Sequence, residues 1–418
     1  MAYQTVTKNS YGSRLKNALG GVGTGFLLLI AGIVLLFWNE GRTVKTTKML
    51  KEVEKVCVHV DNIDSVDPEL NGKLVHMNGA AVTDEVLTDP TFGVSSIVPA
   101  VKLNSSVEYY QYVENKKEEH RDKVGGGEEV ITTYTYEKKW VSSLVNSSNF
   151  ADPDYQRANN RQPILTPDNN QVEAQTVTFG AYTLPNALKG QINGSEAFEI
   201  TVDEERVTQI NAEAKRFYMD QANDYVHVSN NVIYLGRSSS TPEIGDCRIT
   251  YTRVLPGDVS VIAQVVNDSF EQYTAKNGKT FETLYMGTHS LDEMMTQEKA
   301  NNKMMAWVLR ILGILLLYWG FKNIFAILDT LAKVLPFLSS IVGLGTGLVA
   351  GILALALGLI VIAIAWIWYR PLLGILLLAF VVAMIWYFTK KGKEKKAAAA
   401  AAAAAEPAPE APAETPAE

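Results

Sequence analysis

Cysteine and histidine are scarce in this sequence. Two of its 418 residues are cysteines, Cys57 and Cys247, and no histidine lies four residues from another histidine or from a cysteine. A structural zinc site needs a cluster of thiolate and imidazole ligands, so the sequence argues against one. The two cysteines would pair only in an oxidising compartment. We favour the alternative, in which both are buried free thiols.

Motifs of the common enzyme classes are also missing. The sequence has no glycine-rich dinucleotide fingerprint after a strand, no Walker loop, no HExxH and no GxSxG. We therefore expect no enzymatic activity, no cofactor, and no catalytic or metal site. One carboxylate cluster, Asp203-Glu204-Glu205, could bind calcium. We prefer to interpret it as the hydrated start of a helix, where acidic side chains are favourable.

Basic residues are under-represented in the middle of the chain. Residues 39–303 hold 26 Lys and Arg against 39 Asp and Glu, whereas the remaining residues hold 12 against 6. A nucleic-acid groove needs a basic surface. The acidic balance of the middle region therefore argues against nucleic acid as a partner.

Charge is absent altogether from Gly20 to Trp38, where most residues are apolar. About 20 such residues cross a hydrocarbon core about 30 Å thick, and they must do so as a helix. The stretch is too long for the apolar part of a cleaved signal peptide, and no small-residue cleavage site follows it. We predict a cytosolic tail over 1–19 and a retained transmembrane helix over 20–38.

Three further spans are predicted near the C-terminus. Apolar runs cover 304–321, 340–368 and 371–388, each close to the length that a membrane requires. The last two runs are separated by Tyr369-Arg370-Pro371, which we interpret as a tight hairpin turn. Beyond them, residues 389–418 begin with a basic run and end in Ala, Pro and Glu, a composition typical of a disordered tail.

Two features of this block have more than one interpretation. Arg310 lies inside the predicted span 304–321, where a charge is costly, so it should either reach the interface or face a partner helix. Residues 322–336 place apolar side chains at helical spacing, with Lys322 and Asp329 on the other face. This pattern predicts an amphipathic helix in the interface. Continuation of the preceding span is the alternative.

The middle region, 39–303, has patterns typical of strands. Segments 107–113 and 130–140 are rich in aromatic and β-branched residues, and the charged stretch between them predicts a long mobile hairpin tip. Asn277-Gly278 predicts a second hairpin. The fold class is therefore an α+β membrane protein with four transmembrane α-helices, one N-terminal and three C-terminal, and a large, mainly β exoplasmic or lumenal domain.

The sidedness of this arrangement is predicted from basic charge. Both termini are basic, and four spans return the chain to its starting side. Because basic segments flanking membrane helices stay in the cytosol, both tails should be cytosolic. The domain 39–303 should then lie on the non-cytosolic side.

Glycines and charges suggest where the helices meet. Small residues four apart let helices approach closely, and this spacing occurs at Gly21 and Gly25 and again at Gly343, Gly347 and Gly351. These faces serve either packing among the spans of one chain, which we favour, or self-association. At the exit of the first span, Glu40 and Arg42 either stop the helix at the interface or dock the middle domain onto the membrane block.

Several longer segments resemble a known family. The sequence resembles the transmembrane protein 43 family, also called LUMA, from its first span to its last. The resemblance rests on the order and spacing of segments none of which is specific alone: FWNEGRTVKT at 37–46, LVHMNGA at 74–80, DPTFGV at 89–94, PAVKLNSSVEYYQYVE at 99–114, the hairpin around Trp140, SSNF at 147–150, EIGDCR at 243–248 and YRP at 369–371. The short N-terminal tail and the Ala/Pro/Glu-rich C-terminus look more bacterial than animal.

The resemblance implies a multi-pass membrane protein without enzymatic activity. Eukaryotic members are associated with the endoplasmic reticulum and inner nuclear membrane, and a bacterial member would occupy the plasma (inner) membrane. We expect a scaffold that organises membrane protein assemblies, with the lipid bilayer, other membrane proteins and a second copy of the chain as partners. The alternatives are a channel or transport-associated protein, and an exoplasmic ligand-binding or enzymatic domain anchored to the membrane.

Overall fold

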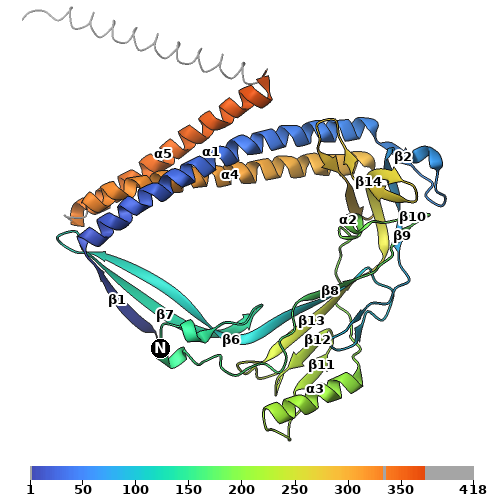
Figure 1. Cartoon of the computed structure of the whole chain (residues 1–418), viewed down its shortest axis with the longest axis horizontal. Coiled ribbons are helices and arrows are strands. Elements are labelled where there is room, and N and C mark those ends of the chain that lie inside the picture. Colours follow the sequence, from blue (N-terminus) through green and yellow to red (C-terminus); the bar gives the residue numbers. More distant parts are fainter. Residues whose placement is uncertain (1, 333–335, 372–418) are drawn as a thin grey trace, which may run out of the picture.

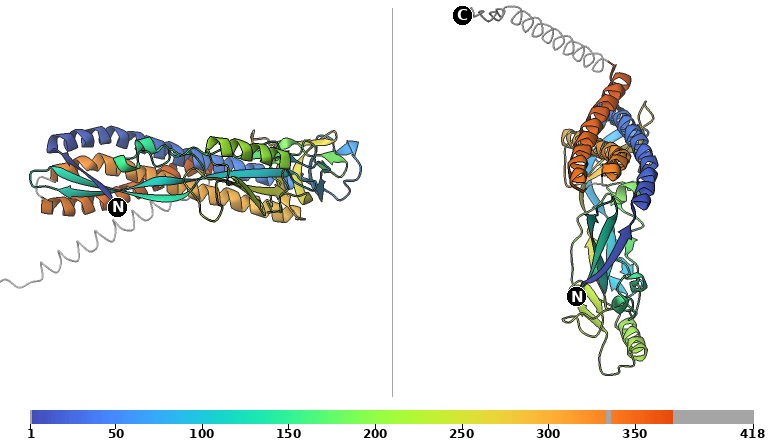
Figure 2. Two further views of the ribbon diagram at one scale, coloured as in Figure 1. Left: turned by 90° about the horizontal axis from the view of Figure 1, so that it is seen from below. Right: turned by 90° about the vertical axis from the view of Figure 1, so that its left-hand side faces the viewer.

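Three long helices form one side of the molecule, and β-sheets form the remainder of a closed outline (Figure 1). The computed structural model describes residues 2–332 and 336–371, and it describes the side-chain surroundings of all of these except 332 and 336–344. The long helices are α1 (Tyr11–Val56), α4 (Leu291–Ala332) and α5 (Pro336–Tyr369). Viewed from the end, the molecule is narrow, with the helices on one side of the sheets (Figure 2).

The three helices are long and apolar enough to cross a membrane. They match three of the predicted spans, with α1 extending beyond 20–38 in both directions. The predicted fourth span, 371–388, and the tail 389–418 lie outside the described residues apart from Pro371. The fold is thus a set of three candidate membrane helices joined to a mostly β body.

The prediction of a separate interfacial helix over 322–336 is wrong for its described part. Residues 322–332 continue α4 without a break, because no proline or glycine interrupts this stretch. Its polar residues find partners on the helices. Asp329 accepts a hydrogen bond from the hydroxyl of Thr346 on α5 at 2.8 Å, and the ammonium of Lys322 lies over the rings of Tyr318 and Trp319.

The N-terminal segment also differs from the prediction. Residues 3–9 form a strand, β1 (Tyr3–Asn9), which pairs antiparallel with β7 (Glu128–Val141). Arg14, at the start of α1, is buried and lies 2.8 Å from the carboxylate of Asp122 at the hairpin tip. These contacts bring residues 3–14 and the hairpin tip together. The side of the membrane that each occupies, inferred from basic charge, stays a prediction.

Two seven-stranded sheets make up most of the body. In the first, β1 and β7 are followed by β6 (Lys102–Asp122), β13 (Cys247–Val254), β12 (Val232–Leu235) and β11 (Val226–Ser229), and β8 (Asn170–Glu173) pairs with β6. The second has the order β18 (Thr283–Met286), β14 (Gly257–Val266), β15 (Ser269–Glu271), β10 (Tyr182–Thr183), β9 (Thr178–Phe179), β3 (Leu74–Val82) and β2 (Val58–Val60), with β14 also pairing with β3.

Short elements complete the body. Two small sheets pair β4 (Thr88–Asp89) with β5 (Val94–Ser95), and β16 (Tyr273–Thr274) with β17 (Thr280–Phe281). The second of these surrounds Asn277-Gly278, as predicted, and Gly278 has the positive φ of 78° that the turn requires. The remaining helices are α2 (Asn186–Lys189), α3 (Glu204–Phe217) and three 3₁₀ turns, Pro68–Leu70, Ser147–Asn149 and Pro153–Tyr155.

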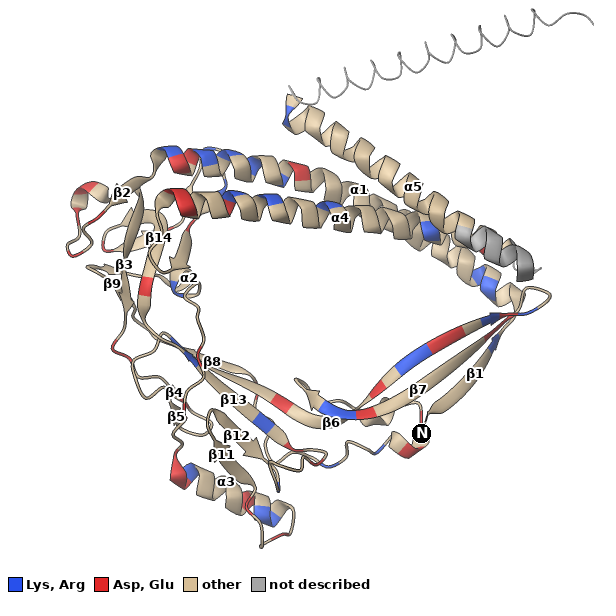
Figure 3. Ribbon diagram, turned by 180° about the vertical axis from the view of Figure 1, so that it is seen from behind, with Lys and Arg blue, Asp and Glu red and all other residues tan. Residues whose placement is uncertain are grey.

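The β6/β7 hairpin is longer and more regular than predicted. The charged stretch that the sequence marks as a mobile loop belongs to the two strands, which pair from Tyr109–Val141 to Asp122–Glu128. Only the five residues 123–127 connect them. Charged residues occur along this ladder (Figure 3), and residues 116–121 are exposed. The hairpin thereby reaches the N-terminal end of α1.

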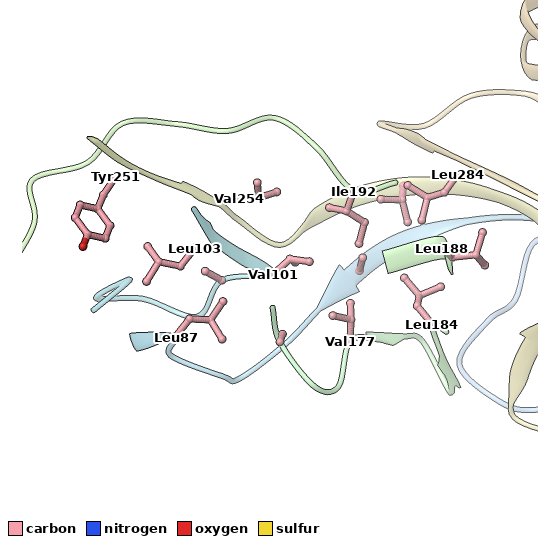
Figure 4. Close-up of a cluster of buried hydrophobic side chains, with 14 of the residues drawn as sticks. Leu87, Val101, Leu103, Val177, Leu184, Leu188, Ile192, Tyr251, Val254 and Leu284 are labelled. Carbon is pink, nitrogen blue, oxygen red and sulfur yellow. The ribbon is translucent and has the colours of Figure 1, made fainter. Parts of the chain in front are cut away.

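Two hydrophobic clusters connect the parts. The larger joins both sheets and includes Leu103, Leu188, Tyr251 and Leu284 (Figure 4). The smaller packs the C-terminal part of α1 and the N-terminal part of α4 against the second sheet. Its buried members are Met49, Leu50, Val53, Leu74, Ile262, Ala275, Phe281, Met294 and Met295. Since each buried aliphatic side chain contributes roughly 1.5–3 kcal/mol, this second cluster fixes the two helices firmly to the body.

Candidate functional site

The antiparallel contact of α1 with α4 is built on glycines. A Cβ atom at Gly25 would lie 2.8 Å from the carbonyl oxygen of Gly320, and one at Gly32 would lie 3.0 Å from that of Gly313. Gly25 and Gly32 are seven residues apart on α1, and Gly313 and Gly320 are seven residues apart on α4. Seven residues are about two helical turns, so the two glycines of each helix lie on the same face. Side chains of any size would separate the backbones here. This close approach fixes the register of the two helices.

The same register brings together a buried ion pair at the end of the apolar segments. Glu40 on α1 is fully buried, and its Oε1 and Oε2 accept hydrogen bonds from Nε and Nη2 of Arg310 on α4 at 2.6 and 3.0 Å. The indole N–H of Trp366 on α5 donates to Glu40 Oε2 at 2.8 Å. We call Glu40, Arg310 and Trp366 the polar junction, since they join all three helices.

Neutral hydrogen bonds extend the polar junction toward the body. The side-chain amide of Asn39 donates to the carbonyl of Ala306 at 2.9 Å, and that of Asn302 donates to the carbonyl of Thr43 at 3.2 Å. Asn39 and Asn302 are both buried. Hydrogen bonds in a dry interior are costly to leave unmade. The hydrogen bonds of Asn39 and Asn302 therefore determine how α1 and α4 are aligned, besides contributing to stability.

The end of α5 closes the junction. Helix α5 ends at Tyr369, and its ring lies so close to Gly41 that a Cβ atom there would be 2.6 Å from it. The ring of Phe37 lies 5.4 Å from that of Tyr369. Arg370 follows outside the helix, with its guanidinium 5.7 Å from the ring of Trp366, and Pro371 is exposed. The described part of the predicted Tyr369-Arg370-Pro371 turn thus lies beside the exit of α1.

The structure places the other predicted residues as follows. Arg310 faces a partner helix, one of the two interpretations of its sequence. Glu40 bonds to Arg310 of α4 and to Trp366 of α5, and Arg42 makes one long hydrogen bond of 3.4 Å, to the hydroxyl of the adjacent Thr43. Docking of the middle domain by either residue stays a prediction. Gly21 and Gly25 face α4, while Gly347 has only the hydroxyl of Tyr318 nearby, and nothing lies close to Gly351. The surroundings of Gly343 lie outside the described residues.

Two histidines far apart in sequence meet at the junction of α1 with the body. Nδ1 of His59 on β2 lies 2.8 Å from Nδ1 of His76 on β3, and Nε2 of His76 lies 3.0 Å from the carbonyl oxygen of His289. Burial, reinforced by His59, lowers the pKa of His76. No spacing of histidines along the chain predicts this pair. Parallel pairing of β2 with β3 places them opposite each other.

The remaining candidates have structural roles. Cys57 and Cys247 are free thiols, as we favoured, but only Cys247 is buried and Cys57 is half-buried. Desolvation raises the pKa of each to about 12. Asp203 caps α3 by accepting hydrogen bonds from the backbone N–H groups of Glu205 and Arg206. No group of three or more metal-ligating side chains occurs among the residues that the structure describes. The polar junction is therefore the strongest candidate for a functional site.

Of the glycines that form the helix contact, the sequence pattern predicted Gly25 but not Gly32, Gly313 or Gly320. The predicted spacing was four residues, whereas Gly25/Gly32 and Gly313/Gly320 are each seven residues apart. The signal was available, because an equal spacing of glycines in two apolar segments predicts a shared contact face.

Comparison with known proteins places this arrangement in a family. The model of a family described as "Transmembrane protein 43" matches residues 109–371, which is more than half of the chain. The chain belongs to the transmembrane protein 43 family. The resemblance inferred from the sequence is thus confirmed, and the matched region contains Arg310, Trp366 and the Tyr369-Arg370-Pro371 turn.

Curated members of the transmembrane protein 43 family extend the match beyond that region. Transmembrane protein 43 of Homo sapiens is 30% identical over 378 residues, covering 90% of each chain, and that of Mus musculus is 32% identical over 362 residues, covering 86% of this chain and 87% of the relative. The homolog of Drosophila melanogaster is 29% identical over 371 residues, covering 87% and 93%. No solved structure matches the chain. The family is one of membrane proteins and assigns no enzymatic reaction to the site.

Proposed function

We propose that this member of the transmembrane protein 43 family is a non-enzymatic scaffold that organises membrane protein assemblies by holding its β body in a fixed orientation at the membrane surface. The observation that carries the proposal is the continuity of α1 and α4. Each helix runs without a break from an apolar segment, past the polar junction, into the hydrophobic cluster of the body. A scaffold needs such a rigid connection, because a flexible one would not orient its partners.

The polar junction supports a coupling role rather than transport. The charges of Glu40 and Arg310 neutralise each other at hydrogen-bond distance, and the indole of Trp366 occupies a further lone pair of the carboxylate. Breaking such a buried pair by removing one partner is strongly destabilising. A proton or ion relay requires groups that can change partners. The carboxylate of Glu40 instead accepts three hydrogen bonds, two from Arg310 and one from Trp366.

Chemical cross-linking in native membranes tests the proposal. The full chain is expressed at its natural level, membranes are cross-linked, and the assemblies that contain the chain are separated by size and identified. We expect reproducible assemblies much heavier than the 46.0 kDa chain, containing other membrane proteins. The variant Glu40→Gln should reduce their yield several-fold, and Glu54→Gln, which alters an exposed pair with Lys299, should not.

Two results would overturn the proposal. The first is a wild-type chain that is recovered only as a monomer after cross-linking. The second is an ion conductance of the purified chain in liposomes that Glu40→Gln abolishes while the fold, measured by protease resistance, is retained. The latter would favour the channel alternative.

A further inference from the structure

A cavity of about 480 Å³ opens beside the polar junction, between α1, α4 and α5. Its wall carries four cationic side chains and no carboxylate: Lys299, Lys303, Arg310 and Arg370. The first three lie on α4, and Arg370 follows the end of α5. A cavity lined in this way concentrates positive charge.

Two of the four cations are available to a ligand. Arg310 is neutralised by Glu40, and Lys299 lies 2.8 Å from a carboxylate oxygen of Glu54. Among the described residues, neither Lys303 nor Arg370 forms an ion pair; the guanidinium of Arg370 contacts only the ring of Trp366. The cavity therefore presents about two uncompensated positive charges. Their natural complement is an anion.

The cavity lies at the depth where lipid headgroups would be found. Many charged residues of α1 and α4 lie at the end next to β14 (Figure 3). Beyond Glu40 and Arg310, α1 carries no charge as far back as Lys16 and α4 none before Lys322. The neighbouring side chains of Trp307, Val308 and Ile311 are apolar and more than half exposed. Trp368, on the last turn of α5, is 75% exposed. Exposed tryptophan beside an uncharged helical segment is typical of the membrane interface.

We propose that this cavity binds the headgroup of an anionic phospholipid. The ammonium of Lys303 and the guanidinium of Arg370 hold the phosphate, and the acyl chains lie along the exposed apolar face of α4 that Val308 and Ile311 form. Basic pockets between membrane helices bind anionic headgroups in this way. A free phosphate ion would use the same two cations but would leave this apolar face uncovered. That difference is the reason to assign a lipid.

Lipid retention measured by native mass spectrometry tests the assignment. The full chain is purified in detergent and mixed with phosphatidylglycerol or phosphatidylcholine of identical acyl chains, and the retained lipids are counted. Each basic residue near a membrane surface contributes about a fivefold preference for anionic lipid. We expect the wild-type chain to prefer phosphatidylglycerol by about 25-fold, the product of two such contributions. Lys303→Gln/Arg370→Gln should abolish the preference, and Lys303→Gln alone should reduce it about fivefold.

A matched control separates the cavity from general surface charge. Lys48 and Lys51 are exposed on α1 and do not line the cavity, so Lys48→Gln/Lys51→Gln removes the same charge and should leave the preference unchanged. Equal retention of the two lipids by the wild-type chain would overturn the proposal. So would an unaltered preference in Lys303→Gln/Arg370→Gln with wild-type thermal stability. Inorganic phosphate that displaces no lipid yet raises the wild-type melting temperature would reassign the cavity to a free anion.

Discussion

Glu40 and Arg310 are 270 residues apart in sequence and form a two-point ion pair between α1 and α4. The pair lies in the same antiparallel register as the glycine contacts Gly25–Gly320 and Gly32–Gly313. Packing shape and charge therefore specify one alignment of the two helices. A shift by one turn would separate the charges and would place side chains where the backbones meet.

We predict that the polar junction is worth more to stability than an exposed pair on the same two helices. Glu40→Ala leaves Arg310 without its carboxylate in a buried site, a change that costs about 3–5 kcal/mol. Glu54→Ala removes a pair whose side chains are both more than a third exposed, which costs at most about 1 kcal/mol. Thermal unfolding of the full chain in detergent measures both. Equal losses of unfolding free energy in the two variants would show that the polar junction contributes no more to stability than the exposed pair.

We predict that a larger side chain destabilises the chain at Gly25, which faces α4, but not at Gly351 on α5. Gly25→Val would force side-chain atoms against the backbone of α4 and should destabilise the chain by about 1–3 kcal/mol, as overpacking does. Gly351→Val meets open space and should change the unfolding free energy by less than about 0.5 kcal/mol. Thermal unfolding in detergent ranks them.

The Gly351 face also permits a test of self-association. If a second copy binds there, Gly351→Leu should lower the oligomer size measured by light scattering while leaving the melting temperature unchanged. An unaltered size would indicate that lipid, rather than a second copy, covers this face.

The three apolar helices and both hairpins could be predicted because each is encoded locally. A span is a run without charge, and Asn277-Gly278 carries its own turn chemistry. The strands at the hairpin tip could not be predicted in the same way, since Lys116, Glu118 and their neighbours have little strand preference. They are extended because β7 pairs with β6 along its whole length and β1 adds a third strand.

The candidate site was predicted only in its components. Glu40 and Arg310 each attract attention as a charge at or inside an apolar segment. That they face each other depends on the register of two helices, which no local pattern determines. In the sequence, Trp366 is followed by Trp368 and Tyr369, a grouping typical of an aromatic belt at the membrane interface. Its hydrogen bond to Glu40 follows from the position of α5, a property of the tertiary fold.

We predict that the contact of His59 with His76 makes stability depend on pH. The pKa of His76 is lowered in the folded chain by burial and by His59, so below about pH 6.5 the unfolded chain binds more protons than the folded one. Stability is therefore fully present above that pH and is lost as the pH falls toward the folded pKa, with a slope of up to about 1.4 kcal/mol per pH unit. Unfolding measured from about pH 8 to about pH 5 gives the slope.

Substitution identifies the group responsible. His76→Gln should flatten the profile between about pH 6.5 and about pH 5, because glutamine does not titrate. His120→Gln, on the exposed part of the hairpin, should leave it in place. A slope that persists in His76→Gln would assign the pH dependence to other groups.

The pairing of β1 with β7 predicts a specific cross-link. Thr5 lies opposite Thr132, and the Cβ atoms of opposite residues in an antiparallel pair are about 4.5–5.5 Å apart, a separation from which small adjustments permit a disulfide. Thr5→Cys/Thr132→Cys should therefore oxidise to a disulfide in intact membranes, read from the shift in mobility on a non-reducing gel after cleavage between the two positions. Thr135 lies three residues farther along β7, so Thr5→Cys/Thr135→Cys is the control and should remain reduced.

The same variants decide which side of the membrane the N-terminal segment occupies. If the disulfide forms, residues 3–9 and the hairpin share one side, and α1 cannot separate them by crossing the bilayer between Gly20 and Trp38. If it does not form, a thiol reagent that cannot cross the membrane should label the two introduced thiols from opposite sides of sealed vesicles. That result would restore the topology inferred from basic charge and would exclude the β1–β7 pairing in the membrane. Cys57 and Cys247 do not interfere, because burial raises the pKa of both thiols to about 12 and keeps them protonated.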